Sequence, residues 1–301
     1  MSKSIVNTNP YPFHFEASKP PPIERDGQHV TISLAHSRGR IPSLQASKVR
    51  ALMQEAHGDS SKILAHVCSY DALSSRLCEE AGFPVIFLSG FAMSSALGLP
   101  DTGYIAFQEV AAKVQEVVRE TTAPVIVDGD TGYGSPMNVR RTVAGDEGQD
   151  IWILARTDSL ILGYDEALAR ATKAIEIGVD AVFVEALPDR ETMARLRKDL
   201  DFPLFANIIE GGKTDNLSAQ ELGELGFSAV AYPWTLVAAK LRSIRETLEA
   251  IKGSFTVGKP PTILSYAEVC EGVGFDKYFA LEERYQYEGR TTGQKGHQWE
   301  D

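Results

Sequence analysis

The amino-acid sequence predicts an α/β fold built on a parallel sheet, and three observations support this prediction. Short apolar runs rich in β-branched residues alternate with helix-like stretches from about residue 62 to residue 233. The runs are apolar throughout, so both faces of each strand are expected to be buried, as in a parallel sheet. Polar side chains follow the ends of successive runs, which favours a (β/α)8-type barrel over a doubly wound sheet.

Seven apolar runs are expected to form the strands of this sheet: Ile63–Cys68, Val85–Leu88, Val125–Asp128, Ile151–Ala155, Ala181–Glu185, Leu204–Asn207 and Ala229–Tyr232. Between them, apolar residues recur at helical spacing in Ala72–Ala81, Phe107–Glu120, Tyr164–Ile177, Glu191–Lys198 and Ala219–Leu225. A closed barrel of this type has eight strands. One βα unit is therefore missing from the count.

The chain is expected to divide into three parts. Residues 1–45, rich in proline and polar residues, are expected to form an irregular arm, and residues 46–290 a barrel with additional C-terminal helices. The first helix is expected at Ser47–His57 with Ser47 as its N-cap, and the last ones at Trp234–Ile251, Ser265–Glu271 and Lys277–Glu288. Residues 291–301 are expected to be a polar tail.

Composition narrows the classes of partner and compartment. The 301-residue chain has a net charge of −11, which argues against nucleic acid as the main partner. Its three cysteines, Cys68, Cys78 and Cys270, lack metal-ligand spacing and fit a reducing compartment. No apolar run approaches the ~20 residues of a membrane span, and the N-terminus lacks the apolar centre of a signal peptide. We expect no membrane partner and a cytoplasmic protein, with a mitochondrial location as the alternative.

Two carboxylates mark the most informative stretch of the chain, residues 124–134. Asp128 and Asp130 stand at the end of an apolar strand, and side chains two residues apart point to the same side of a strand. The loop that follows contains Gly132 and Gly134, which allow the backbone to pass close to a ligand. The pattern fits a divalent metal or substrate site, or equally a polar strand end that caps the next helix.

Four motifs in order resemble the isocitrate lyase/phosphoenolpyruvate mutase superfamily: Ser89-Gly90, Leu97–Asp101 (LGLPD), Asp128–Gly134 (DGDTGYG) and Ala155–Asp158 (ARTD). The resemblance covers about residues 62–285. The stretch Cys270–Tyr287 is most similar to the branch that contains 2-methylisocitrate lyase, 2,3-dimethylmalate lyase and oxaloacetate acetylhydrolase. The resemblance implies a (β/α)8 barrel, a homotetramer, Mg²⁺ (or Mn²⁺) as the cofactor and a bond cleaved or formed next to a 2-oxo acid.

The resemblance also assigns roles to individual residues. It implies metal ligation by Asp128, Asp130 and Asp101, with Glu185 acting largely through metal-bound water. Arg156 resembles the arginine that steadies the oxygens of the substrate, and Arg156 and Glu185 are the expected catalytic residues. The implied substrate contacts are Ser89, Gly90, Phe91, Arg156, Asn207, Gly211 and Gly212. Singly, these residues have structural explanations as well, because Arg156 could pair with Asp158 or Glu185 and Ser89 could cap a helix.

The sequence departs from the family pattern after Val143. There, family members have a further strand and a mobile loop whose cysteine, in a CGH motif, serves as acid/base, whereas here Ala144–Asp150 leads directly into Ile151–Asp158. None of the three cysteines stands at the corresponding position. Three explanations stay open: a segment omitted from the sequence as translated, an inactive paralogue, or altered chemistry. The abrupt junction between intact motifs favours the first.

The function expected from this resemblance is a Mg²⁺-dependent carbon–carbon bond lyase or hydrolase. Its substrate would be a small 2-hydroxy or 2-oxo di- or tricarboxylate, and the reaction would pass through the enolate of a 2-oxo acid. Phosphonopyruvate-type mutase or hydrolase chemistry is the close alternative. A catalytically impaired paralogue that only binds carboxylates is the alternative from another class.

Overall fold

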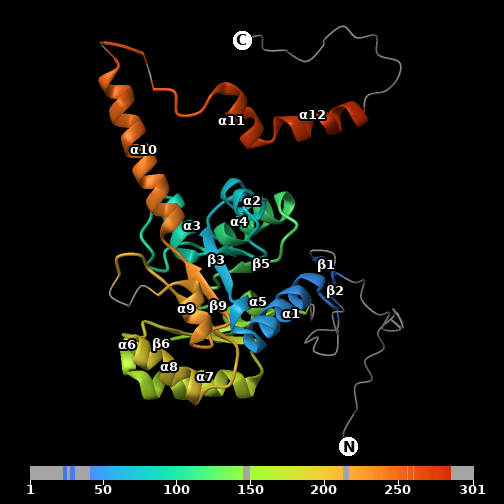
Figure 1. Ribbon diagram of the computed structural model, residues 1–301, viewed down its shortest axis with the longest axis vertical. Coiled ribbons are helices and arrows are strands. Elements are labelled where there is room, and N and C mark those ends of the chain that lie inside the picture. Colours follow the sequence, from blue (N-terminus) through green and yellow to red (C-terminus); the bar gives the residue numbers. More distant parts are fainter. Residues whose placement is uncertain are drawn as a thin grey trace, which may run out of the picture. The chain divides into compact units, whose positions relative to one another are not determined.

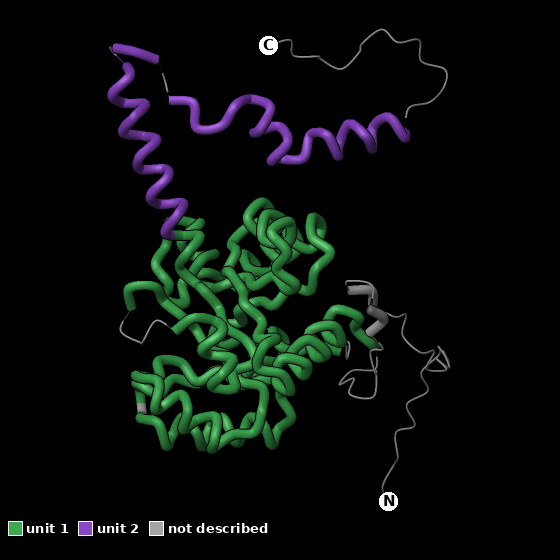
Figure 2. The backbone as a smooth tube through the Cα atoms, viewed as in Figure 1, with its two compact units in different colours: residues 1–237 green, residues 238–301 purple. Residues whose placement is uncertain are grey.

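The computed structural model describes two short strands, Ile23–Arg25 (β1) and Gln28–Val30 (β2), and residues 41–144, 150–212, 217–255, 257–259 and 261–285. The expected polar tail, residues 291–301, and most of the expected arm lie outside these residues. The chain separates into two compact units, residues 1–237 and residues 238–301 (Figure 2). The sheet and the candidate site belong to the first unit.

A seven-stranded parallel sheet forms the centre of the first unit (Figure 1). The strands follow the order β5-β4-β3-β9-β8-β7-β6. Their bounds are Leu64–Ser69 (β3), Ile86–Leu88 (β4), Val125–Val127 (β5), Leu154–Asp158 (β6), Ala181–Glu185 (β7), Leu204–Asn207 (β8) and Ala229–Tyr232 (β9). The α/β fold of the barrel type is therefore confirmed, with seven strands among the described residues.

The two ends of the sheet are strands that follow one another in the sequence. Among the described strands, β5 pairs only with β4, and β6 pairs only with β7. The first strands of this sheet in sequence order, β3 and β4, are joined to its last ones through the pairing of β3 with β9. The sheet therefore curls into a barrel-like arrangement that is open between β5 and β6, where an eighth strand would stand in a closed barrel.

Helices connect the strands of this sheet. Those of the first unit are Leu44–Gly58 (α1), Ala72–Glu80 (α2), Gly90–Ala96 (α3), Phe107–Glu120 (α4), Pro136–Ala144 (α5), Ser159–Leu162 (α6), Tyr164–Ile177 (α7), Arg190–Asp199 (α8) and Ala219–Glu224 (α9), with a 3-10 turn (η2) at Ser60–Lys62. Helix Thr235–Gly253 (α10) begins in the first unit and continues into the second.

The buried side chains separate the inside of the barrel from its outside. On β3, Leu64 and Cys68 join an interior cluster with Phe183 and Phe205, while Val67 packs outward toward α2 and α4. Helix α1 adds Val49 and other residues to the interior cluster, next to the residues at which the strands begin. Since α1 covers this end, the opposite end, where the strands finish, is the one left for a site.

Two of the differences from the sequence prediction concern the start of β6 and the N-cap of α1. The strand expected at Ile151–Ala155 begins three residues later, because the N–H of Ile153 is already taken by Asp180 Oδ2, at 2.7 Å. Arg156 and Asp158 consequently lie within β6 instead of after it. The N-cap of α1 is Ser43, whose hydroxyl accepts a hydrogen bond from the N–H of Ala46, and the expected cap Ser47 is buried inside the helix.

The second unit contains the rest of α10, Tyr266–Val273 (α11) and Phe275–Arg284 (α12). Ser265 caps α11, accepting a hydrogen bond from Glu268 N, while the Glu268 carboxylate accepts one from Ser265 N. Neither α11 nor α12 contains a buried residue. Across the described parts of the chain, no helix combines the length and the apolar character needed to cross a bilayer.

Candidate active site

Asp128 follows β5 directly, and the backbone on both sides of it fixes its carboxylate. Its N–H donates to the carbonyl of Leu88 at the end of β4, at 2.9 Å. Its Oδ1 accepts from the N–H of Asp130 at 2.9 Å, and its Oδ2 accepts from the N–H of Gly90 at 3.1 Å. A Cβ on residue 90 would lie 3.0 Å from that Oδ2. Glycine at position 90 therefore lets the first turn of α3 approach the carboxylate.

The loop after Asp128 has a strained backbone that holds a second carboxylate near the first. Asp130 and Tyr133 have positive φ values of 48° and 61°, which L-residues adopt infrequently. Gly132 has φ 89°, and a Cβ there would lie 2.5 Å from Val139 Cγ2. Such strain is concentrated at functional sites.

Two pKa values show that carboxylates gather at this loop. Burial, and then the charges of Asp128 and Asp130, raise the pKa of the Asp101 carboxyl above its ordinary value. The same causes raise the pKa of Tyr133 to about 12, and its hydroxyl donates to the Asp128 carbonyl at 3.4 Å. The three expected metal ligands therefore share one region of negative potential.

A second group of polar side chains comes from β6, β7 and β8. Arg156 Nη2 lies 3.1 Å from Glu185 Oε2, and Asn207 Nδ2 donates to the same oxygen at 2.9 Å. The other carboxylate oxygen of Glu185 accepts from the N–H of Ala186 at 3.1 Å. The Arg156 guanidinium also lies over the Phe183 ring, 5.1 Å from its centroid. Glu185 thus positions both Arg156 and Asn207, and the expected structural pairing of Arg156 with Glu185 is present.

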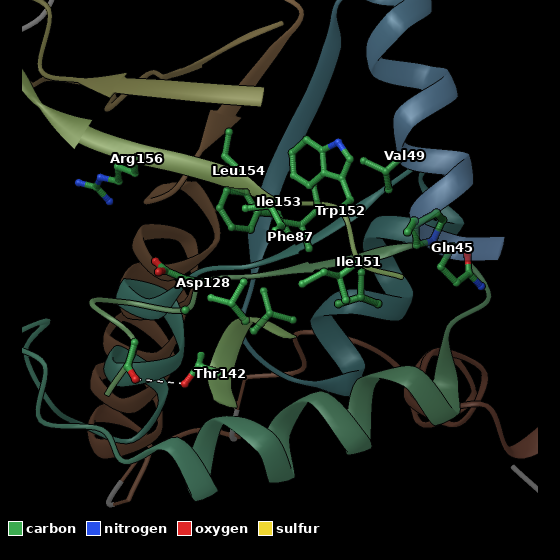
Figure 3. Close-up of a pocket in the computed structure, with 18 of the residues that line it drawn as sticks. Gln45, Val49, Phe87, Asp128, Thr142, Ile151, Trp152, Ile153, Leu154 and Arg156 are labelled. Atoms are coloured by element: carbon green, nitrogen blue, oxygen red, sulfur yellow. Dashed lines mark hydrogen bonds between the residues drawn. The ribbon is translucent and has the colours of Figure 1, made fainter. Parts of the chain in front are cut away.

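Both groups face one cavity of about 350 Å³ at the end of the barrel where the strands finish. Of the expected site residues, Ser89, Phe91, Asp101, Asp128, Arg156 and Asn207 line it. Asp130 lines the neighbouring cavity instead (Figure 3), and Glu185 lines neither of these two cavities but contacts Arg156 and Asn207. Gly211 and Gly212 form a turn after β8 that lines neither of these two cavities. Ser89 caps α3 as well, because its hydroxyl accepts from the N–H of Ala92 at 3.4 Å.

Aromatic residues and a cysteine complete the lining; the sequence analysis expected Phe91 there but did not assign Trp234 or Cys68 to the site. Phe91 and Trp234 stack with their ring centroids 5.0 Å apart. Trp234 follows the end of β9, so extending the strand-end rule to the last strand would have found it. Cys68 also lines the cavity. Burial is the main cause that raises the pKa of its thiol, so it stays protonated at neutral pH.

The donor set of the site fits Mg²⁺ in chemistry. Within the described ranges, no three His, Cys, Asp or Glu side chains come together as a ready metal cluster. Mg²⁺ usually keeps several waters and needs only one or two carboxylates from the protein. Asp128 and Asp130, which share one loop, supply oxygens of that kind.

Comparison with known proteins identifies the family of the chain. The sequence profile of the phosphoenolpyruvate phosphomutase family matches residues 54–147 and 144–252. The chain belongs to this family. A 2-methylisocitrate lyase from Halalkalibacterium halodurans is 30% identical over 281 residues, covering 79% of this chain and 92% of that protein. A 2,3-dimethylmalate lyase structure is 25% identical with a TM-score of 0.72, covering 80% of this chain and 95% of its own. A phosphonopyruvate hydrolase solved with oxalate and Mg²⁺ has the same fold, with 20% identity, a TM-score of 0.70 and coverage of 81% and 99%.

The match to the family profile is divided into two stretches near the open edge of the sheet. The two matched stretches meet at residues 144–147, at the end of α5 and before β6. The alignment with the Halalkalibacterium protein spans 281 positions, although 79% of this chain is fewer residues than that. The alignment therefore contains positions with no counterpart in this chain. The family segment that the sequence analysis expected to be missing between β5 and β6 stays a prediction.

Proposed function

We propose that this chain is a Mg²⁺-dependent carbon–carbon bond lyase or hydrolase. Its substrate would be a small 2-hydroxy or 2-oxo di- or tricarboxylate, cleaved through the enolate of a 2-oxo acid. One observation carries the proposal. Asp128 follows β5 and Arg156 lies on β6, the two edge strands of the sheet, and both line the cavity at the C-terminal ends of the strands. Family membership supports the same reaction class, because the relatives that match include lyases of substituted dicarboxylates and tricarboxylates.

Each residue contributes a distinct action to this reaction. Arg156 would pair with a substrate carboxylate, since its guanidinium has five N–H donors and can bind two oxygens at once. Ser89 and Phe91, which line the same cavity, would contact that carboxylate as well, next to Gly90, whose N–H is bonded to Asp128. Asn207 would donate to a substrate oxygen while Glu185 holds it in place. Bound Mg²⁺, or Mn²⁺, would offset the negative charge of the enolate, with Asp128, Asp130 and Asp101 as the proposed holders.

The described cavity offers few side chains that could transfer a proton during the reaction. The titratable side chains that line it are Cys68, Asp101, Asp128 and Arg156. Cys68 is a protonated thiol, and Asp101 and Asp128 belong to the proposed metal site. This observation favours the second candidate function: a paralogue that binds carboxylates with Mg²⁺ and does not turn them over.

An assay separates the two candidates. The purified protein with Mg²⁺ is incubated with 2-methylisocitrate, 2,3-dimethylmalate, oxaloacetate or phosphonopyruvate, and pyruvate, oxalate and phosphate are followed. Release of pyruvate from 2-methylisocitrate or 2,3-dimethylmalate, or of oxalate from oxaloacetate, supports the lyase or hydrolase. Release of pyruvate together with phosphate from phosphonopyruvate indicates the phosphonopyruvate reaction. If no substrate is turned over but oxalate still binds in a Mg²⁺-dependent manner, the paralogue that only binds carboxylates is supported. Absence of both turnover and oxalate binding contradicts the proposal.

Two further expectations stay predictions. They are the homotetramer and the cytoplasmic location, and sedimentation of the purified protein would test the first. A mass near four times 32.9 kDa is expected. A monomer at micromolar concentration would contradict it.

A further inference from the structure

A buried serine ties the start of α6 to the end of β7, next to Glu185 of the candidate active site. The Ser159 hydroxyl lies 3.0 Å from the carbonyl oxygen of Glu185 and 2.9 Å from that of Ala186. A hydroxyl has one proton to donate, so the two carbonyl oxygens share it. Only 9% of Ser159 is exposed, so these carbonyls take the place of water as its partners.

The register of the sheet explains why Ser159 reaches both carbonyls. β6 and β7 are parallel, and their last paired residues are Asp158 and Glu185. Ser159 and Ala186 follow directly, one on each chain segment. Helix α6 begins at Ser159 (Figure 1), and the Asp158 carboxylate caps it by accepting from the N–H of Leu160 at 2.8 Å. The chain therefore turns as soon as β6 ends, and the Ser159 hydroxyl lies across the end of β7.

The backbone of Ala186 is strained, and the strain comes directly after Glu185. Ala186 has a φ of 61°, a left-handed conformation that is unfavourable for alanine and that glycine adopts freely. The next residue, Leu187, is buried in an apolar cluster. The carbonyl oxygens that Ser159 contacts belong to the peptide groups immediately before and after the Ala186 Cα. One hydroxyl thus holds both peptide groups whose relative rotation defines this conformation.

The same backbone decides which oxygen of Glu185 faces the site. The N–H of Ala186 donates to Glu185 Oε1 at 3.1 Å. Oε2 is left for Arg156 Nη2, at 3.1 Å, and for Asn207 Nδ2, at 2.9 Å. Arg156 and Asn207 both line the cavity of the candidate active site. A rotation of the peptide group before Ala186 would therefore displace the carboxylate and the two side chains that it holds.

We propose that Ser159 is a positioning residue of the candidate active site. Its hydroxyl fixes the peptide groups around Ala186, whose N–H fixes the carboxylate of Glu185. Glu185 in turn sets the positions of Arg156 and Asn207. This inference rests on the proposed function, because it concerns the two side chains that would bind the substrate. A serine that only stabilises the local fold is the alternative.

Calorimetric titration of oxalate into the full chain with Mg²⁺ tests this inference. Ser159→Ala removes the hydroxyl and should weaken oxalate binding about three- to tenfold, the range expected for one lost hydrogen bond. Ser47→Ala is the matched control. Ser47 is also buried and donates to a carbonyl oxygen, that of Ser43 at 2.9 Å, but it lies on α1 at the other end of the barrel. This control should leave oxalate affinity within about twofold of the wild type.

A double-mutant cycle shows whether the effect passes through Glu185. In Glu185→Ala no carboxylate is left to be positioned. Adding Ser159→Ala to that variant should therefore change oxalate affinity by less than about twofold. A hydroxyl that only stabilises the local fold would weaken binding by the same factor with and without Glu185.

Ala186→Gly perturbs the same peptide groups without removing the hydroxyl. Glycine adopts a φ of 61° without strain, but it gives the backbone after Glu185 more freedom. Oxalate binding should weaken at least about twofold, while the urea midpoint of unfolding stays near that of the wild type, because relief of strain offsets the added freedom of the unfolded chain. This variant tests the inference even if Ser159→Ala does not fold.

The outcomes separate this inference from the function on which it rests. If oxalate binds the wild type with Mg²⁺ and binds Ser159→Ala or Ala186→Gly as tightly, the inference is wrong and the proposed function stands. The inference is also wrong if Ser159→Ala weakens binding by the same factor with and without Glu185. If the wild type does not bind oxalate, the proposed function fails and this inference fails with it.

Discussion

The ion-pair network around Arg50 gives a prediction whose size follows from the structure. Arg50 on α1 contacts both oxygens of Asp150, with Nη1 at 2.7 Å and Nη2 at 2.8 Å, and its Nε lies 2.9 Å from Asp180 Oδ1. Only 11% of the Arg50 side chain and none of the Asp150 side chain is exposed. Nη2 also donates to the carbonyl of Ile151, at 2.6 Å. The network thus anchors the chain as it enters β6, the strand that carries Arg156.

Replacing Arg50 with methionine keeps much of the apolar stem and removes the charge. The buried Asp150 carboxylate then loses its two bonds to the Arg50 guanidinium, and breaking a buried pair in this way costs about 3–5 kcal/mol. That cost is a large part of the ~5–15 kcal/mol by which a domain of this kind is stable. The double variant Arg50→Met/Asp150→Leu removes both charges, so it should recover part of the loss.

Urea unfolding at pH 7, followed by circular dichroism, measures this difference. We expect the free energy of unfolding to fall by at least 3 kcal/mol in Arg50→Met and by less in the double variant. Arg170→Met is the matched control, because Arg170 pairs with Glu166 on the exposed face of α7 and should cost less than ~0.5 kcal/mol. A loss below 1 kcal/mol in Arg50→Met, or equal losses in the single and double variants, would refute the reasoning.

Three further variants test the site and the interior. Arg156→Lys should weaken Mg²⁺-dependent oxalate binding about 10- to 100-fold in calorimetry, because lysine cannot bind two oxygens at once; unchanged affinity would rule out the proposed contact. Gly90→Ala places a Cβ 3.0 Å from Asp128 Oδ2 and should weaken the same binding, whereas Gly58→Ala, with nothing within 4 Å, should not. Burial lowers the pKa of His66 from 6.5 to about 4. Protonation of this imidazole in the unfolded chain therefore lowers the free energy of unfolding by about 3 kcal/mol as the pH falls from 6.5 toward 4, and has no effect above pH 6.5. In His66→Leu, the fall in unfolding free energy between pH 7 and pH 4 should be smaller by that amount, and an equal fall would contradict the assignment.

The sequence predicted the strands well wherever apolar runs end at a glycine or a charged residue. The expected strand Ala181–Glu185 and helix Tyr164–Ile177 agree with β7 and α7 at both ends. The start of β6 was predicted too early, because Ile151–Ile153 are as apolar as a strand. The N–H of Ile153 is bonded to the Asp180 side chain, and this long-range contact is not visible in local sequence.

The site was predictable in its charged residues and less so in its aromatic ones. The strand-end pattern predicted Asp128, Arg156 and Asn207, which the structure brings to one cavity. The stacking of Trp234 on Phe91 depends on the pairing of β3 with β9, which brings the last strand beside the first. The strand-end rule, extended to β9, would have pointed to Trp234 but not to its stacking on Phe91.

The most direct test of the central claim is calorimetric titration of oxalate into the protein with and without Mg²⁺, for the wild type and for Asp128→Asn. Our account predicts binding that depends on Mg²⁺ in the wild type and is at least tenfold weaker in the variant, with unchanged unfolding by urea. Equal binding without Mg²⁺, or equal affinity in Asp128→Asn, would contradict a metal-dependent carboxylate site at the end of β5.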